Sequence, residues 1–428
     1  MQKLVVSNNK RYLQKQDGTP FFWLADTAWE LFHALSNEKA DHYLKTRADQ
    51  GFNCVQAVVL AELSGLTTPN HYERFPLKRN EAGLFDPTMP DTDGEYSYFD
   101  HVDYIVNVAE SYGLYIAMLP TWGDKFFARH GVGPEIFTPQ NAFSYGEFIG
   151  ARYKNKDNIV WVMGGDRSVE NPLHLEIVGS MALGIKKSGA NQLITFHPCD
   201  RSSSSELLHH EDWLDFNMIQ SGHTAPSKTV ELITRDYNLT PPKPTIDAEC
   251  HYEDHPISFR PENGYFDSTD VRRVSYWAVF SGSAGITYGH HSIWSMQTEE
   301  YNFPYYIKSW EQALTSPGAF QMRHLRELCE SKDFQNGTPK NDILAKNFEG
   351  VNYQAAFGSD KTILVYSPSG LPVFILKDRL ENRFTPSWFD PRSGEYQRAA
   401  YTERDDCCMF LPPNSGRNFD FVLVIDEG

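Results

Sequence analysis

Two carboxylates come at the ends of buried runs and could act together in acid–base chemistry. Asp166 ends the run "NIVWVMGGD", and Glu249 lies in "PTIDAEC". Because side chains alternate along a strand, Asp166 shares a face with the small and branched residues of its run, and Glu249 shares one with Asp247. Two carboxylates that flank a glycosidic bond are the minimum equipment for glycoside hydrolysis, provided that one of them stays protonated near neutral pH.

Polar and aromatic side chains also end or directly follow the other buried runs. Indole faces stack on the C–H surfaces of sugars, and Asp, His, Gln and Tyr side chains hydrogen-bond to sugar hydroxyls. The candidates for substrate contact are Asp26, Trp29, His33, Gln56, Trp122, His197, Gln220, His223, His251, Tyr288, His290 and Trp294.

Eight short apolar runs alternate with helical or loop stretches and must position these side chains. The runs lie at 21–29, 52–60, 114–122, 158–166, 192–200, 216–222, 244–250 and 284–291. Nearly continuous apolar strands between helices indicate a parallel sheet covered on both faces. Eight such units favour an α/β fold, a (β/α)₈ TIM barrel over residues 1–335, whose chemistry sits at the C-terminal ends of the strands. A doubly wound sheet would require a glycine-rich phosphate loop, and the first run ends "ADTAW" instead.

The chain changes character after about residue 335. Residues 336–428 contain short strand-like runs separated by Gly, Pro, Asn and Asp, which predicts a small C-terminal antiparallel β-sandwich. A helical stretch at 306–331 joins the two regions. Structural support of the barrel is the default expectation for the second domain, and sugar binding is the alternative.

Composition excludes several classes of partner. With 39 Lys and Arg against 56 Asp and Glu, the net charge is −17, so the basic footprint of a nucleic-acid-binding protein is missing. There is no membrane-spanning run, no CxxC pair and no HExxH motif, and we expect no metal and no cofactor. The N-terminus "MQKLVVSNNK" lacks the apolar region of a signal peptide, which leaves a cytoplasmic location or a trimmed precursor that was secreted or periplasmic.

The sequence resembles the apiosidase-like glycoside hydrolases, glycoside hydrolase family 140 and its relatives. The matching segments are "FFWLADTAWELFH", "GFNCVQAVV", "NIVWVMGGD" and "PTIDAECHYE". The resemblance implies a retaining pair in which Asp166 is the acid/base and Glu249 the nucleophile, acting on apiose or another pentofuranoside of plant cell-wall polysaccharide. Relatives usually carry Asn-Glu after the fourth strand, where this chain has Gly165-Asp166. The shorter aspartate leaves open whether the carboxylate spacing suits retention or inversion.

Other interpretations of the same residues stay open at this stage. Asp166 could cap the helix that starts near Pro172, Glu249 could be a buried salt-bridge partner for a barrel arginine, and Glu253 is a competing nucleophile. A metal-dependent amidohydrolase is the enzymatic alternative, with ligands drawn from Asp26, His197, His223 and Asp247. A non-catalytic carbohydrate-binding protein is the third hypothesis.

Overall fold

Eight parallel strands form a nearly closed barrel in the computed structural model, which describes residues 1–129, 131–302, 304–380 and 384–427. The strands are β4 (Trp23–Thr27), β5 (Cys54–Leu60), β8 (Tyr115–Thr121), β9 (Ile159–Gly164), β10 (Ile194–His197), β12 (Asn217–Gln220), β13 (Thr245–Glu249) and β14 (Gly285–Tyr288). Their order in the sheet is β10-β9-β8-β5-β4-β14-β13-β12, and β11 (Ser202–Ser203) pairs antiparallel with β12. At the seam, the Thr195 hydroxyl donates to the Phe216 carbonyl at 2.7 Å. The TIM-barrel prediction is confirmed.

Strand alternation divides the barrel residues between two apolar clusters. Val160 and Val162 of β9 pack with residues of the barrel interior, whereas Trp161 and Met163 pack against the outer helices. This is the division that the sequence "VWVM" predicts, because successive side chains point to opposite faces. Asp166 lies two residues beyond the end of β9, on a turn.

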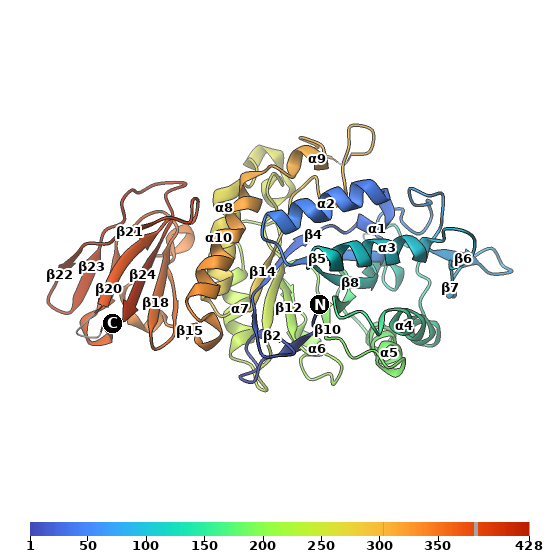
Figure 1. Ribbon diagram of the computed structural model, residues 1–428, viewed down its shortest axis with the longest axis horizontal. Coiled ribbons are helices and arrows are strands. Elements are labelled where there is room, and N and C mark those ends of the chain that lie inside the picture. The colour runs from blue at the N-terminus through green and yellow to red at the C-terminus, as the bar shows by residue number, and fades with distance from the viewer. Residues whose placement is uncertain (130, 303, 381–383, 428) are drawn as a thin grey trace.

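Helices surround the barrel (Figure 1). They are α1 (Leu31–Ala34), α2 (Asn37–Asp49), α3 (Tyr98–Ser111), α4 (Pro139–Tyr153), α5 (Pro172–Lys187), α6 (Ser205–Leu208), α7 (Thr229–Tyr237), α8 (Ser268–Phe280), α9 (Trp310–Ala313) and α10 (Pro317–Ser331). The single helical stretch expected at 306–331 is interrupted, because Pro317 starts a new helix where its missing N–H costs nothing. Helix α4 was not predicted; it packs closely on α5, where a Cβ at Gly146 would lie 2.3 Å from the Met181 carbonyl oxygen.

Short strands and 3₁₀ turns complete this part of the chain. A three-stranded sheet, β1 (Leu4–Val6), β2 (Leu13–Lys15) and β3 (Pro20–Phe21), packs its apolar side chains with those of the barrel interior. A hairpin, β6 (Leu77–Arg79) and β7 (Phe85–Pro90), projects at the end away from the C-terminal domain (Figure 1). The 3₁₀ turns of the chain are η1 (Gly123–Lys125), η2 (Ile257–Phe259), η3 (Pro261–Asn263), η4 (Phe334–Asn336), η5 (Asn341–Ile343), η6 (Gly350–Asn352) and η7 (Lys377–Arg379).

The C-terminal domain consists of two antiparallel sheets. The first is β15 (Thr338–Pro339), β17 (Ala355–Gly358), β18 (Thr362–Ser367), β24 (Phe421–Glu427), β20 (Phe384–Phe389) and β21 (Tyr396–Arg398); the second is β16 (Leu344–Lys346), β19 (Val373–Leu376), β23 (Cys407–Phe410) and β22 (Tyr401–Glu403). Residues of both sheets share one apolar core, which includes Val365, Ile375 and Leu423. The predicted antiparallel β-domain is therefore present.

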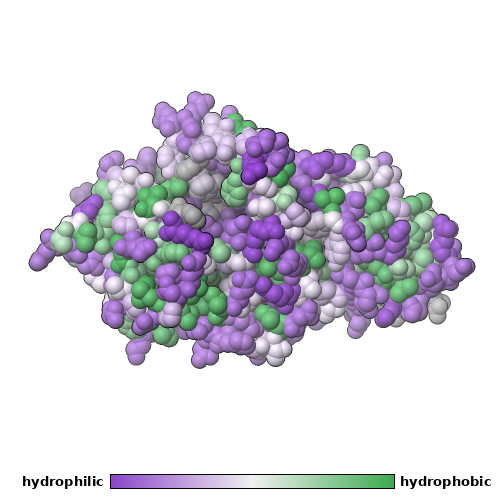
Figure 2. All heavy atoms as spheres, turned by 180° about the vertical axis from the view of Figure 1, so that it is seen from behind, coloured by the Kyte–Doolittle hydropathy of each residue, from purple (hydrophilic) through white to green (hydrophobic). Residues whose placement is uncertain are grey.

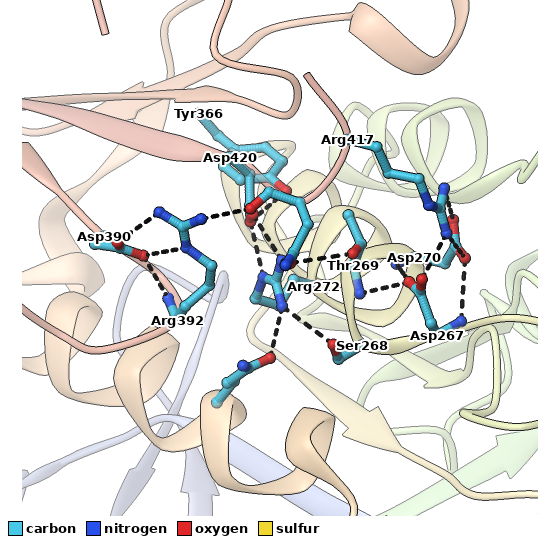
Figure 3. Close-up of polar contacts among 12 residues, drawn as sticks. Asp267, Ser268, Thr269, Asp270, Arg272, Tyr366, Asp390, Arg392, Arg417 and Asp420 are labelled. Carbon is cyan, nitrogen blue, oxygen red and sulfur yellow. Dashed lines mark hydrogen bonds and ion pairs between the residues drawn. The ribbon is translucent and has the colours of Figure 1, made fainter. Parts of the chain in front are cut away.

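Buried ion pairs join the C-terminal domain to helix α8 (Figure 3). The Arg272 guanidinium donates two hydrogen bonds to Asp420, at 2.9 and 2.7 Å, and both side chains are fully buried. The Tyr366 hydroxyl also donates to Asp420, at 3.1 Å. Nearby, Arg417 contacts Asp270 and Asp267 at 2.8 and 2.9 Å. Helices α8 and α10 lie between the barrel and the β-domain (Figure 1), so this network fixes the domain to the barrel wall.

Removal of one partner from this network should be costly. We expect Asp420→Ala to lower the free energy of unfolding by about 3–5 kcal/mol, because it leaves the Arg272 charge buried without its partner. Denaturant unfolding measures the loss. Glu330→Ala is the matched control, since it breaks the exposed Arg326–Glu330 pair and should cost less than about 1 kcal/mol. Equal losses in the two variants would contradict a stabilising role for the buried pair.

The surface is polar over both parts of the molecule. Figure 2 shows hydrophilic side chains across the barrel and the β-domain, with apolar residues in small groups between them. In the described part of the chain, no helix combines the length and the apolar character needed to cross a bilayer.

Candidate active site

Asp166 lies on a turn with unusual backbone geometry at the end of β9. Gly164, Gly165 and Asp166 have φ values of 84°, 109° and 53°, so all three are left-handed. A Cβ at Gly164 would lie 2.6 Å from the His197 carbonyl oxygen, and one at Gly165 would lie 2.7 Å from a ring carbon of Trp122. Only glycine meets both constraints, and Asp is among the few side chains that tolerate this conformation. The "GGD" turn therefore has a strained backbone that positions one carboxylate, and such strain is common at functional sites.

Asp166 and Glu249 line one cavity of about 330 Å³ at the C-terminal ends of the barrel strands. Its walls come from at least six different strand ends and the loops that follow them. The lining residues are Trp29, Glu62, Trp122, Asp166, Asp200, Gln220, His223, Glu249, Tyr252, His255, Phe259, His291, Trp294, Pro304 and Tyr305. This is the face at which barrel enzymes carry out their chemistry.

Glu249 is a buried carboxylate held by two imidazoles. Its side chain is 8% exposed, His223 Nε2 donates to Oε1 at 2.9 Å, and His197 Nε2 lies 3.3 Å from Oε2. Burial alone would raise the pKa of Glu249, but the interactions of its carboxylate with His197 and His223 outweigh burial and lower that pKa. Glu249 is therefore held in its ionised form.

Asp166 has the opposite electrostatic environment. The enclosed position of its carboxyl, and then the negative charge of Glu249, raise the pKa of Asp166 to about 6. Arg167 limits the rise, since its Nη1 lies 3.1 Å from Asp166 Oδ2. A hydrogen bond with Gln220 also lowers the pKa of Asp166 and so limits the rise. Two carboxyl groups on one cavity thus have pKa values that are pushed apart, which is the pattern of an acid and a nucleophile or base.

Aromatic rings form much of the remaining wall. The rings of Trp29 and Trp122 are 5.1 Å apart, and Trp29 also contacts the edge of His197 at 5.2 Å. The ring of His223 stacks on that of His255 at 4.3 Å. Such flat apolar faces beside hydrogen-bonding groups suit a sugar ring, which has C–H faces and a hydroxyl rim.

The structure brings together about half of the side chains expected to contact substrate. Trp29, Trp122, Gln220, His223 and Trp294 line the cavity with both carboxylates. His197 is fully buried behind Glu249 and reaches the site through that carboxylate.

The other expected contacts lie elsewhere, each with a structural partner. Asp26 is fully buried and accepts hydrogen bonds from Arg47 at 2.6 Å and from Tyr43. The Gln56 amide donates to the Ala248 carbonyl at 2.9 Å and thereby ties β5 to β13. The remaining four are His33, close to Thr68; His251, stacked on Phe266; Tyr288, which donates to Glu253; and His290, which contacts Asp254.

Several lining residues were missed because they come from loops. Glu62 and Tyr305 lie in long loops whose path the sequence pattern does not reveal. Asp200 and His291 are the last residues of two predicted runs, so the reasoning that selected the other candidates could have included them.

Two of the competing interpretations, Asp166 as a helix N-cap and Glu253 as the nucleophile, find no support in the structure. Helix α5 is capped by Asn171, whose side chain accepts from the His174 N–H at 3.0 Å, so Asp166 is not its N-cap. Glu253 lies outside the cavity, where it accepts from Tyr288 at 2.7 Å and from the Gly318 N–H. Among the described residues, no group of three or more His, Cys, Asp or Glu side chains is arranged to hold a metal ion.

Comparison with known proteins gives two family matches and close structural relatives. Residues 7–336 match the model "Apiosidase-like, catalytic domain", and residues 338–426 match "Putative collagen-binding domain of a collagenase". A structure titled "Glycoside hydrolase" is 30% identical, with a TM-score of 0.89, over 100% of this chain and 97% of that one. A glycoside hydrolase family 5 structure from Bacteroides vulgatus ATCC 8482 is also 30% identical, with a TM-score of 0.90, over 99% and 93% of the two chains. A search of curated proteins gives no match.

The family match covers most of the chain, and the two structural relatives cover nearly all of it. Both relatives are glycoside hydrolases by title, and their barrels superpose on this one together with the C-terminal domain. The chain therefore belongs to the Apiosidase-like family of catalytic domains and is a glycoside hydrolase.

Proposed function

We propose that this glycoside hydrolase works by a two-step retaining mechanism, with Asp166 as acid/base and Glu249 as nucleophile. The observation that carries the proposal is the contrast between two carboxyl groups on one cavity. The pKa of Asp166 is raised to about 6, while His197 and His223 lower that of Glu249. A proton donor and an ionised nucleophile are the two groups that the first step needs at the same time.

The two steps follow from these protonation states. In the first, a Glu249 oxygen attacks the anomeric carbon while Asp166 gives its proton to the departing glycosidic oxygen. In the second, Asp166 takes a proton from water, and that water displaces Glu249 from the anomeric carbon, which restores both carboxyls. His223 and His197 orient the nucleophile, and Trp29, Trp122, Gln220 and Trp294 contact the sugar.

The proposed substrate is apiose or another pentofuranoside attached to plant cell-wall polysaccharide. The family model supports this choice through its Apiosidase-like description. The modest volume of the cavity, about 330 Å³, and its aromatic walls suit a single small sugar at the bond that is cut.

Hydrolysis of a panel of sugars tests the proposal. Aryl pentosides, aryl hexosides and apiose-bearing pectic oligosaccharides would be offered to the parent, Asp166→Asn and Glu249→Gln, each with and without EDTA. We expect turnover of a pentofuranoside that EDTA does not change, that Glu249→Gln abolishes and that Asp166→Asn strongly reduces on the oligosaccharides. Proton NMR of the first product should show a retained anomeric configuration. Inversion, or turnover that EDTA removes, would overturn the mechanism.

The dependence of kcat/KM on pH should follow the two carboxyls. Asp166 must be protonated to help the leaving group, so activity should fall as the pH rises through about 6. Glu249 must be ionised, and its lowered pKa places the loss of activity on the acid side below the usual glutamate value of 4.5. A profile from about pH 3 to about pH 9 on an oligosaccharide measures the basic limb and shows that activity persists on the acid side below pH 4.5. A profile that is flat from pH 5 to pH 8 would contradict the assignment of Asp166.

A further inference from the structure

A second cavity, of about 490 Å³, adjoins the first. The two share three carboxyl residues, Glu62, Asp166 and Asp200, whereas Glu249 lines only the first. The remaining walls of the second cavity are Leu63, Asp124, Arg129, Gly131, Val132, Arg167, Ser168 and Cys199. Asp166 therefore stands on the boundary between the two cavities, and the nucleophile stands on one side of it.

We propose that the second cavity is the binding site for the leaving group, and that it takes a hydroxyl-rich sugar. The inference rests on the proposed function. The proton donor must reach the oxygen that joins the two halves of the substrate, and the nucleophile must reach the anomeric carbon of one half only. A boundary position for Asp166, with Glu249 confined to the first cavity, places the glycone in the first cavity and the departing sugar in the second.

The chemistry of the lining gives the class of ligand. The first cavity has six Trp, Tyr and Phe rings and more from histidines, whereas the described lining of the second contains no aromatic ring. Guanidinium, hydroxyl and carboxyl groups take their place. A ligand there is held by hydrogen bonds to its hydroxyls and not by ring stacking, which fits a sugar better than an apolar aglycone.

One buried side chain of this lining keeps donor capacity. Arg167 is 8% exposed, and its Nη1 donates to the carbonyl and the carboxylate of Asp166, at 2.6 and 3.1 Å. Its Nε has no hydrogen-bond partner among the described residues. Arg167 lines the second cavity, and its guanidinium holds the Asp166 carboxylate. Arg167 therefore links the acid to the wall of this cavity.

Buried polar contacts hold the loop after β8 that forms the opposite wall. Lys125 contacts Asp124 at 2.6 Å with both side chains fully buried, and the Gly133 N–H donates to the other Asp124 oxygen at 2.8 Å. At the rim, Arg129 and Ser168 both donate to Glu170, at 2.6 and 3.0 Å. These contacts hold the described residues of this wall in place, and a wall held by internal contacts lowers the cost of ordering it on binding.

Blocking the second cavity should lower kcat/KM for a substrate with a large leaving group and spare a substrate with a small one. Val132 is 59% exposed and lines only this cavity, so Val132→Trp should fill it. Two substrates with the same glycone would be compared: a disaccharide and the glycosyl fluoride, whose fluoride leaving group needs no sugar site. We expect kcat/KM to fall at least tenfold for the disaccharide and to stay within about twofold for the fluoride. Leu207→Trp, at a site that is 62% exposed and lines neither cavity, is the control and should change neither value.

Cys199 offers a second measurement on the parent chain. It lines the second cavity, and it is partly exposed whereas the other five cysteines are buried. Alkylation of Cys199 by iodoacetamide should reduce disaccharide hydrolysis and spare the fluoride, and Cys199→Ser should abolish that effect. Equal losses on both substrates, or no loss on the disaccharide in either experiment, would overturn the leaving-group assignment. A parent that hydrolyses neither substrate would instead overturn the proposed function.

Discussion

Replacement of Glu249 by alanine is expected to reduce kcat by about 10⁵-fold or more, because it removes the group that forms the covalent intermediate. Added azide should restore part of the turnover, since the truncated side chain leaves room for an external nucleophile beside His197 and His223. The product should be a glycosyl azide whose anomeric configuration is inverted relative to the substrate. Proton NMR identifies that configuration, and steady-state kinetics gives the loss.

Asp247→Asn is the matched control for this variant. Asp247 lies two residues earlier on the same face of β13, is fully buried, and accepts from Thr229 at 3.0 Å without reaching the cavity. Its replacement should lower the melting temperature but leave kcat within about tenfold of the parent. If Asp247→Asn lost as much kcat as Glu249→Ala while remaining folded, the nucleophile would have to be sought elsewhere.

The barrel could be predicted because its strands are short, apolar and regularly spaced. In "IVWVMGGD" the branched and bulky residues alternate, and the structure places Val160 and Val162 inside and Trp161 and Met163 outside. Glu249, the last residue of β13, and Asp166, on the left-handed turn after β9, line one cavity. Local sequence suffices here because the period of a strand fixes which way its side chains point.

The site was harder to predict where long-range partners decide the outcome. Asp26 ends the first barrel strand, as a substrate-binding residue could, yet Arg47 on helix α2 binds its carboxylate inside the protein. Gln56 likewise reaches across to the Ala248 carbonyl. The residues next to Asp26 and Gln56 in the sequence do not reveal that Arg47 and the Ala248 carbonyl are their partners. The loops that bring Glu62 and Tyr305 to the cavity have no period at all, so their course depends on packing that a pattern does not encode.

The C-terminal domain also illustrates the limits of a family description. Its match describes a collagen-binding domain of a collagenase, a statement about other proteins. In this chain the domain is fixed to helix α8 by the buried Arg272–Asp420 pair and by Arg417 (Figure 3). Helix α8 leads from the loop after β13, the strand of Glu249, to β14. The contacts thus support the structural role expected of this domain, as a brace for the barrel wall next to the nucleophile strand.

Replacement of Asp166 by alanine is expected to have an effect that depends on the leaving group. For an oligosaccharide, whose departing oxygen needs a proton, kcat/KM should fall by about 10²–10⁴-fold. For an aryl glycoside with an acidic phenol the first step needs little proton donation, so its rate should fall much less. The fall in activity above about pH 6 should also disappear, because Asp166 is the group whose raised pKa produces it.

Glu62→Gln is the control that distinguishes Asp166 from its neighbour. Glu62 lines both cavities, and burial, together with the charges of Glu30 and Asp166, raises its pKa, so it is, with Asp200, one of the other carboxyls that could donate a proton there. If Asp166 is the acid, the activity of Glu62→Gln still depends on the leaving group and still falls above pH 6. In that case azide added to Asp166→Ala yields a glycosyl azide of retained configuration. If Glu62→Gln removes both features and Asp166→Ala keeps them, the proton comes from Glu62, and Asp166 acts on the reaction only through its charge.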